Sequence, residues 1–557
     1  MSTERRTVRS GEPSALGYRR LIEGPGEPWL VRSSRGVEPL EVPGWLDGAQ
    51  CLLAVAHLSD LHVCDHQSPA RVEMLNRYGD PDSPVTEKLA ELTTYRPQEL
   101  LTAVVLDAAC SAVRATTPAA PFSGRPLTLA ITTGDVVDNA QANELGWYLA
   151  LLDGGSVLPD SGDTSRYEGT AAVDDPRYWH PDGQFDDLTR VGFGFPTVPG
   201  LLDAARRGFD ALGLGLPWLA AHGNHDNLVQ GTIAAVPLLE LVATGDAKPV
   251  RLDPEPDPDA LVELMIALAQ AKPDGLESLL GAQWLEVTPD PARALIRRAD
   301  FVVAHDRAGA LPARHGFSDD NVGNGTAYYR YDVPVAEQLT DGGIDGSHFV
   351  TAVTFLILDT VVSEGGWQGS LDEPQLDWLR GELHAADTDY RYVILASHHT
   401  ADTMVNELAS GSAPRRVLGD ELLVVLAEHR CVIAWLNGHT HANTLIPHLD
   451  DSGSGLWEIT AASLIDWPQQ WRTVELVRAL DEDQIAWLGL VTTVVDHAGP
   501  PAWTGGTGQP LELAALSREL AANDLRSRDT TPELSPRRGR PADRNAILLL
   551  RDPFALT

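Results

Sequence analysis

The chain has 557 residues and a formal net charge of −37, from 42 Lys and Arg against 79 Asp and Glu. Hydrophobic residues make up 43% of the chain, enough for a sizeable core, so wholesale disorder is excluded. The acidic balance argues against broad contact with long nucleic acid or anionic lipid, although bound metal ions would let a single phosphate approach.

Targeting signals and a disulfide framework are not expected from the sequence. The first twenty residues contain arginines but no following apolar run, so they do not resemble a secretory signal peptide. No apolar stretch is long enough to cross a membrane. The cysteines, at positions 51, 64, 110 and 431, are widely spaced and favour buried free thiols. These features predict a cytoplasmic protein with no membrane partner.

Short apolar runs typical of buried strands occupy residues 52–58, 127–133, 216–221, 350–358, 392–396 and 432–436. Helical patterns lie between some of them, at 97–114, 373–385 and 419–428. Later runs at 456–461, 472–479 and 484–495 suit either a second sheet or a continuation of the first. The alternation predicts an α/β fold, a four-layer αββα sandwich of two mixed sheets flanked by helices, with helical and loop insertions.

Composition also suggests how the chain is organised. We expect an N-terminal extension over residues 1–49, a central domain over 50–500 and a partly disordered C-terminal tail over 501–557. The central domain carries insertions at about 153–198, which predicts an ordered surface loop region, and 231–345, which includes a small helical cap at 231–299. The Arg/Pro segment at 526–544 is interpreted as a solvated linker, with a basic tail for a partner as the alternative.

Polar side chains follow five of the predicted strands directly. They are Asp60 and His62, then Asp135, then Asn224, then His398, and finally His439 and His441. Because sites in open α/β sheets lie beyond the carboxyl ends of strands, we expect these turns to converge. Imidazole, carboxylate and amide ligands favour Mn, Fe, Zn, Co or Ni, and seven candidates imply two ions with one bridging carboxylate. His399 is the alternative to His398, which lies closer to its strand end.

Other polar residues near these turns have plainer interpretations. His57, His66 and His222 are expected to be structural or to support ligands. Asp359 is interpreted as a turn former, and Arg71 and Arg77 as surface partners of nearby acids, with contact to substrate phosphate as the alternative.

The ordered blocks D-x-H, G-D-x-x-D, G-N-H-D, a lone His and G-H-x-H resemble the calcineurin-like metallophosphoesterases. Residues 60–73 and 457–472 further resemble the start and end of a bacterial subgroup with long insertions. The resemblance implies a first metal on Asp60, His62 and His441, a second on Asn224, His398 and His439, and Asp135 as the bridge. It also implies His225 as general acid, oriented by a hydrogen bond from Asp226, with Asp138 and Asn139 supporting the site or near the substrate.

The function expected on this basis is binuclear hydrolysis of phosphate esters by a metal-bridging hydroxide, with two divalent ions, Mn, Fe or Zn. The expected substrate is a small soluble phosphodiester or a nucleotide-like phosphomonoester. Two alternatives stay open: a catalytically silent metal-binding scaffold for a protein partner, and a nuclease, which would need a basic groove against the overall charge. The His225–Asp226 pair favours an enzyme, since a scaffold needs no proton donor for a leaving group.

Overall fold

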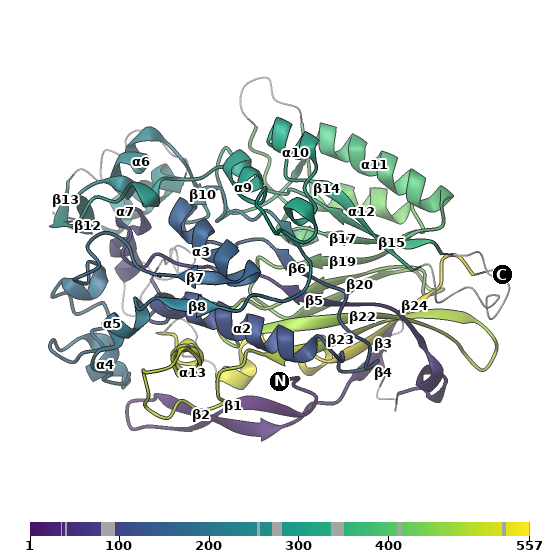
Figure 1. Ribbon diagram of the computed structural model, residues 1–557, viewed down its shortest axis with the longest axis horizontal. Helices are drawn as coiled ribbons and strands as arrows, with labels where there is room; N and C mark the ends of the chain where they lie inside the picture. The colour runs from purple at the N-terminus through teal and green to yellow at the C-terminus, as the bar shows by residue number, and fades with distance from the viewer. Residues whose placement is uncertain are drawn as a thin grey trace.

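The computed structural model describes residues 1–34, 36–38, 42–78, 95–252, 257–269, 281–335, 350–409, 415–525 and 531–555. Within them, a sheet of eight strands and a sheet of six strands are stacked, with helices on the outside (Figure 1). One continuous cluster of buried side chains includes residues of both sheets. The predicted α/β class with two mixed sheets flanked by helices is confirmed.

The eight-stranded sheet holds three of the strands whose ends carry candidate ligands. Its order is β4 (Gly36–Glu38), β3 (Leu30–Ser33), β24 (Ala546–Arg551), β23 (Ala486–Asp496), β22 (Gln470–Leu480), β5 (Gln50–Leu58), β6 (Leu129–Thr133) and β9 (Trp218–Ala221). Strands β5, β6 and β9 are parallel neighbours, so their carboxyl ends meet at one edge. The long antiparallel pair β22–β23 joins this sheet beside β5, rather than forming a second sheet.

The six-stranded sheet holds the other two ligand-bearing strands. Its order is β14 (Tyr329–Pro334), β15 (Ala352–Ile357), β17 (Tyr392–Ala396), β19 (Val432–Asn437), β21 (Gly455–Thr460) and β20 (Thr444–Leu449). Strands β15, β17, β19 and β21 are parallel, and β14 and β20 are antiparallel edges. Every residue of β15, β17 and β19 is buried, which explains their continuous rather than alternating apolar character.

Helices cover the outer faces of both sheets. Helices α2 (Thr102–Thr116) and α13 (Pro510–Ala522) pack together on the eight-stranded side, while α11 (Glu373–Thr388) and α12 (Gly419–Ala427) lie on the six-stranded side (Figure 1). Helix α2 is rich in Ala, Val and Leu and buries most of its length, since it lies between the sheet, α13 and α3 (Ala142–Asp153). The described layers therefore run helix, sheet, sheet, helix.

The insertions and the other connections between core strands form small elements of their own. They include β7 (Gly155–Val157), α4 (Leu188–Phe193), α5 (Leu201–Ala205), β8 (Phe209–Ala211), β10 (Leu228–Val229), β11 (Ile233–Ala234), α6 (Pro237–Thr244), β12 (Ala247–Leu252), α7 (Pro258–Ala269), β13 (Ala282–Glu286), α9 (Arg298–Ala304), α10 (Asp319–Asn324), β16 (Leu371–Asp372) and β18 (Arg416–Val417). The segment predicted as a helical cap also contains the antiparallel pair β12–β13, because its two extended runs satisfy each other's backbone groups.

Both ends of the chain are built into the fold. Strand β24 lies between β3 and β23 and pairs with both, and the hairpin of β1 (Arg6–Pro13) and β2 (Arg19–Pro25) lies beside α13 (Figure 1). The prediction of an appended C-terminal tail is wrong for α13 and β24. The apolar run of β24 is almost wholly buried, so it serves as a sheet strand. Among the described residues, no helix combines the length and apolar character needed to cross a membrane.

Substitution Leu550→Ala tests whether β24 stabilises the fold. Leu550 is fully buried in the shared core, so the cavity left should lower the free energy of unfolding by about 2–5 kcal/mol. Leu534→Ala, in the same C-terminal segment but 75% exposed, is the matched control and should change it by about 0.5 kcal/mol or less. Urea unfolding followed by circular dichroism measures both. Equal small changes would show that β24 contributes little.

Candidate metal centre

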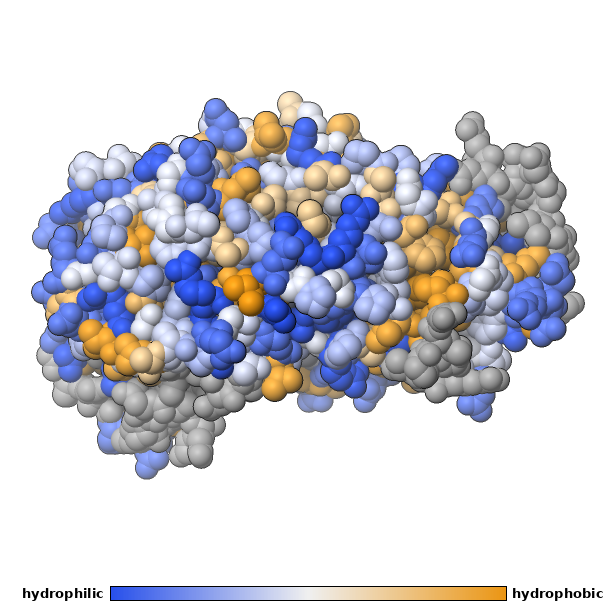
Figure 2. Space-filling view, turned by 90° about the horizontal axis from the view of Figure 1, so that it is seen from below, coloured by the Kyte–Doolittle hydropathy of each residue, from blue (hydrophilic) through white to orange (hydrophobic). Residues whose placement is uncertain are grey.

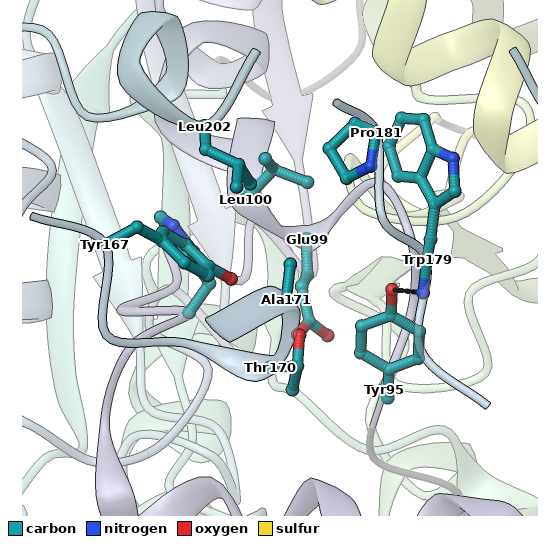
Figure 3. Close-up of a pocket in the computed structure, with 10 residues that line it drawn as sticks. Tyr95, Glu99, Leu100, Tyr167, Thr170, Ala171, Trp179, Pro181 and Leu202 are labelled. Atoms are coloured by element: carbon teal, nitrogen blue, oxygen red, sulfur yellow. Dashed lines mark hydrogen bonds between the residues drawn. The ribbon is translucent and has the colours of Figure 1, made fainter. Parts of the chain in front are cut away.

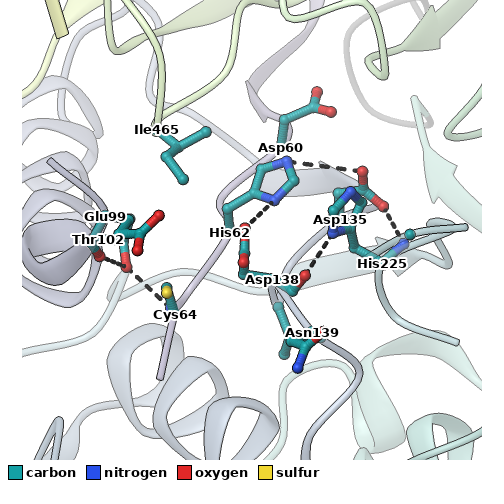
Figure 4. A network of polar contacts seen from close by, with 12 residues as sticks. Asp60, His62, Cys64, Glu99, Thr102, Asp135, Asp138, Asn139, His225 and Ile465 are labelled. Carbon is teal, nitrogen blue, oxygen red and sulfur yellow. Dashed lines mark hydrogen bonds and ion pairs between the residues drawn. The ribbon is translucent and has the colours of Figure 1, made fainter. Parts of the chain in front are cut away.

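The five turns predicted to converge do so, between the two sheets. Asp60 and His62 follow β5, Asp135 follows β6, and Asn224 and His225 follow β9. From the other sheet, His398 follows β17, and His439 and His441 follow β19. Backbone hydrogen bonds tie neighbouring turns together, from Asp60 N to Gly134 O (3.1 Å) and from Gly438 N to His398 O (3.0 Å). The carboxyl ends of both sheets thus form one site, and Figure 4 shows the part of it that follows β5, β6 and β9.

The backbone is strained at the residues that face this site. Five candidate ligands lie in the left-handed region: Asp60 (φ 51°), His62 (φ 45°), Asp135 (φ 50°), His439 (φ 67°) and His441 (φ 56°). For residues with a Cβ atom such conformations cost on the order of 1 kcal/mol each, and they cluster at functional sites. The fold holds these side chains in place against that cost.

Two glycines allow the turns to approach so closely. A Cβ atom on Gly223 would overlap the backbone and carboxylate of Asp135, and one on Gly438 would overlap the hydroxyl of Ser59 and the carboxylate of Asp60. Glycine is suited to such tight turns, since it has no Cβ atom. The structure adds that any larger residue would displace a candidate ligand.

The Nε2 atoms of His62 and His441 face each other, and in this contact they cannot both donate a hydrogen bond. His62 Nδ1 lies 3.0 Å from the Asp138 carboxylate, and His441 Nδ1 lies 2.6 Å from that of Asp466, so each Nδ1 carries the proton. Both Nε2 atoms then present lone pairs, only 3.1 Å apart, and His441 Nε2 is 3.4 Å from Asp60 Oδ1. Such a cluster repels itself unless a positive charge lies within it.

A second electron-rich group surrounds Asp135 Oδ2. His398 Nδ1 donates to the carbonyl of Thr133 (2.8 Å), which leaves Nε2 facing Asp135 Oδ2 at 3.2 Å and His439 Nδ1 at 3.1 Å. Burial alone would lower the pKa of His398, but the Asp135 carboxylate outweighs it and raises the pKa to about 9. Burial alone would raise the pKa of Asp135, yet His398 and His225 hold that pKa well below its usual range. The site attracts positive charge.

Asn224 and His399 are distinguished by their hydrogen bonds. The Asn224 amide donates to Gly231 O (2.9 Å), while its buried Oδ1 has no partner among the described residues. Both ring nitrogens of His399 are engaged, Nε2 with Trp367 O (3.0 Å) and Nδ1 with the Thr360 hydroxyl (2.7 Å). The Nε2 of His398 contacts only other candidate ligands and the Asn224 oxygen has no partner, so both fit metal ligands, whereas both nitrogens of His399 are bonded to groups outside the candidate set.

Ligand atoms of the acidic and imidazole residues lie within 4.8 Å of one another in four overlapping groups. The groups are Asp60–His62–His441, Asp60–Asp135–His398, His62–Asp135–His225 and His398–His399–His439. Asp135 belongs to two of them, with Oδ2 3.8 Å from His62 Nε2 on one side and 3.2 Å from His398 Nε2 on the other. A carboxylate in this position suits a bridge between two divalent cations.

The carboxylates that fix the imidazole rings are themselves held by ion pairs. Asp138, bonded to His62 (Figure 4), also pairs with Arg71, which contacts Glu99 at 2.9 Å. The expectation that Arg71 pairs at the surface is wrong, because its side chain is fully buried. The side chain of Arg77 lies outside the described residues.

Asp466 plays the same part for His441 and was not identified from the sequence. Its carboxylate contacts Arg96 Nε at 2.9 Å and Arg537 Nη1 at 3.0 Å, in addition to His441. Arg537 belongs to the Arg/Pro segment interpreted as a linker. The signal available was the Ser-Leu-Ile-Asp466-Trp block, which the family resemblance already covered.

His225 lies at the site, but Asp226 does not orient it. His225 Nδ1 is 2.5 Å from the carbonyl oxygen of Asp138, and its backbone N–H donates to Asp135 Oδ1 (2.8 Å). Asp226 instead accepts backbone hydrogen bonds from Val136 (2.8 Å) and Gly223 (2.7 Å). The predicted Asp226–His225 hydrogen bond is therefore wrong; Asp226 ties the β6 and β9 turns together. Burial, followed by Asp135, raises the pKa of Asp226 to about 6, and burial lowers that of His225 to about 4.

The remaining predicted residues have structural partners. His57 faces the Thr133 hydroxyl at 2.9 Å, and His66 stacks on Tyr167. His222 lies 3.2 Å from Asp359, which also pairs with Arg298 at 2.5 Å. Asp359 thus joins the turn after β15 to the inserted α9 through a partly exposed ion pair, beyond the turn role expected from the sequence. Asn139 Oδ1 accepts from the backbone and side chain of Gln230, both at 2.9 Å.

A small aromatic pocket lies behind the Arg71–Glu99 pair (Figure 3). Tyr95, Tyr167 and Trp179 line it, and the Tyr95 hydroxyl accepts a hydrogen bond from Trp179 N at 3.0 Å. Tyr95 and Trp179 belong to a buried cluster that joins the first insertion to the N-terminal segment, α2 and α13. The aromatic residues of the insertion thus pack into a shared core.

Comparisons with known proteins give limited information. No protein-family model matches the chain, and no curated protein sequence matches it. Among solved structures, one that is similar is the crystal structure of a dimetal phosphatase from Danio rerio, at 13% identity and a TM-score of 0.33, covering 80% of this chain and 100% of that one.

Substitutions at His398 and His399 test which of the neighbouring histidines binds metal. His398→Gln removes the free Nε2 beside Asp135, so the purified variant should lose at least one of two bound metal equivalents. His399→Gln should retain both, since neither of its nitrogens is free. Metal analysis by inductively coupled plasma mass spectrometry measures the content. Loss in His399→Gln with retention in His398→Gln would reverse the assignment.

Proposed function

We propose that this protein hydrolyses phosphate esters with two divalent metal ions held between its two sheets. The observation that carries the proposal is the pair of Nε2 lone pairs on His62 and His441, 3.1 Å apart beside Asp60. Two carboxylates, the proton positions on the imidazole rings and the unpartnered oxygen of Asn224 belong to the same cluster. Together they make it a site that favours positive charge. The ordered resemblance to metallophosphoesterases, carried by the sequence blocks alone, supports the same function.

The residues fit two ions in the way the resemblance implies. Asp60, His62 and His441 would hold one, Asn224, His398 and His439 the other, and Asp135 Oδ2 would bridge them. Mixed imidazole, carboxylate and amide donors suit Mn, Fe or Zn. When bound, such ions neutralise charge on phosphate oxygens and lower the pKa of water toward neutrality.

His225 is the residue we propose as proton donor to the leaving group. The Asp138 carbonyl fixes the proton on His225 Nδ1, so Nε2 is the nitrogen that can take up and release a second proton. Its ring packs edge-on against His62, 4.7 Å between centroids, and it is less buried than the neighbouring Asn224 and Asp226. This placement puts the donor beside the ligands, on the accessible side.

We propose that two arginines beside the candidate metal ligands bind the substrate. Arg96 and Arg537 both contact the carboxylate of Asp466, which also holds His441. Their side chains are 13% and 26% exposed, and the remaining N–H groups suit phosphate oxygens. Trp367, 37% exposed, stacks on His439 at 5.6 Å and would cover an organic group. A small soluble phosphodiester or a nucleotide-like phosphomonoester fits this opening, and long nucleic acid is disfavoured by the overall charge.

An assay with model esters tests the proposal. With added Mn²⁺, the protein should hydrolyse p-nitrophenyl phosphate or bis-p-nitrophenyl phosphate, and EDTA should abolish turnover. Asp135→Asn should reduce the rate at least 100-fold, because it weakens both ion positions. Asp186→Asn, at a side chain 88% exposed, is the control and should be unaffected.

Two outcomes of this assay would favour the alternatives. Absence of turnover for both esters, with two metal equivalents bound, would favour a metal-binding scaffold. Cleavage of single-stranded DNA at low salt, without turnover of either small ester, would favour a nuclease.

Substitution His225→Ala separates proton donation from metal binding. A poor leaving group needs the proton more, so turnover of phenyl phosphate should fall about 100-fold or more, and that of p-nitrophenyl phosphate clearly less. Metal content should stay at the wild-type level. Equal losses for both substrates, or full activity on phenyl phosphate, would show that His225 is not the donor.

A further inference from the structure

A cavity of about 350 Å³ lies outside the metal centre, on the side of the eight-stranded sheet that carries α2 and α13. Its walls come from the start of the chain, from α2 and the loop after it, and from the segment that follows β23. None of its lining residues belongs to the metal centre. Figure 2 shows this side of the molecule, where hydrophilic side chains crowd the middle of the view.

Two buried groups in the wall have hydrogen-bond donors without acceptors. Arg518, 1% exposed, donates Nη2 to the His497 carbonyl (3.1 Å), but its Nε and Nη1 have no acceptor among the described residues. His497 Nδ1 accepts from Gly499 N (3.0 Å), so the neutral ring carries its proton on Nε2, which likewise finds no acceptor in the described structure. A buried donor without an acceptor is unfavourable, so these groups favour a ligand that accepts hydrogen bonds.

The charges around the cavity favour an anion. Arg5 and Arg6 line it in addition to Arg518, in a chain whose net charge is −37. Arg6 pairs with Glu23 at 2.7 Å and Arg5 with Glu4 at 3.8 Å, both at partly exposed positions where such pairs are weak. Asp496 is the acid in the wall, and its Oδ1 already accepts from the Gln470 amide at 2.7 Å.

Part of the wall is apolar, although Ser2 and Thr116 also line it. Val8, Ala112, Ala115, Ala119, Pro121 and Pro501 line it, and the volume is that of small-molecule sites. An inorganic ion alone would leave most of this surface without contact. The unpaired donors and the apolar wall together match a small molecule that has an anionic head and an apolar body.

We propose that this cavity is a binding site for a small organic anion with a phosphate or carboxylate head. The head accepts hydrogen bonds from Arg518 and His497, with Arg5 and Arg6 at the opening, and the body packs against α2. The site does not depend on the metal centre.

Calorimetric titration of the full chain, stripped of metal with EDTA, tests this proposal. The probes are phenylphosphonate and phenylacetate, which distinguish the two head groups, with benzyl alcohol as the neutral control. We expect one of the two anions to bind with 1:1 stoichiometry and benzyl alcohol not to bind. Asp135→Asn should bind the anion as wild type does.

Arginine variants place the site. Arg518→Gln should weaken binding at least tenfold. Arg6→Gln, at a partly exposed position that folding tolerates, should weaken it several-fold, and less at high salt. Arg9→Gln, on the same strand but exposed and outside the cavity, is the matched control and should bind like wild type. Lack of binding of both anions at millimolar concentration, wild-type affinity in both Arg6→Gln and folded Arg518→Gln, or loss of binding in Asp135→Asn would overturn the proposal.

Discussion

The carboxylate of Asp135 contacts residues that come from both sheets. One oxygen accepts the backbone N–H of His225 and so fixes the turn after β9 (2.8 Å), while the other lies 3.2 Å from His398, which comes from the six-stranded sheet. A buried carboxylate is costly without positive charge around it. Here the nearest groups are imidazoles that present lone pairs, so protons or cations must supply that charge.

The second requirement is that the imidazoles be held in one tautomer. Asp138 does this for His62 and Asp466 for His441; Asp138 pairs with the buried Arg71, and Asp466 with the partly exposed Arg96 and Arg537. These arginines come from distant parts of the chain, Arg71 after β5 and Arg537 near the C-terminus. The insertions take part as well, since Lys248 in β12 contacts Glu73 at 2.8 Å, which lies 3.6 Å from Arg71. The segments beyond the minimal core thus stabilise the site.

The local charge also changes how the overall charge should be understood. A net charge of −37 argues against a polyanion that must touch a broad surface. It does not argue against one phosphate at the opening beside Arg96 and Arg537, or against a small anion beside Arg518. Several of the chain's acids are themselves candidate ligands or their supports.

What could be predicted from the sequence was local. Asp60, Asp135 and His398 each come directly after a short apolar run. A buried strand and the turn that follows it are contiguous in the sequence, so the pattern predicts their places at strand ends. The pairing of β24 between β3 and β23, the contact of Arg537 with Asp466 and the burial of Arg71 are long-range and left no local signal. The Asp226–His225 hydrogen bond was expected from adjacency in the motif, but the sharp turn directs Asp226 to backbone N–H groups instead.

Anomalous diffraction at the absorption edge of the bound metal, from crystals grown with Mn²⁺ or Zn²⁺, tests the central claim most directly. The account predicts two peaks on either side of Asp135 Oδ2, one among Asp60, His62 and His441, and one among Asn224, His398 and His439. No peak at these residues, or a single ion held by the His398–His399–His439 group, would contradict it.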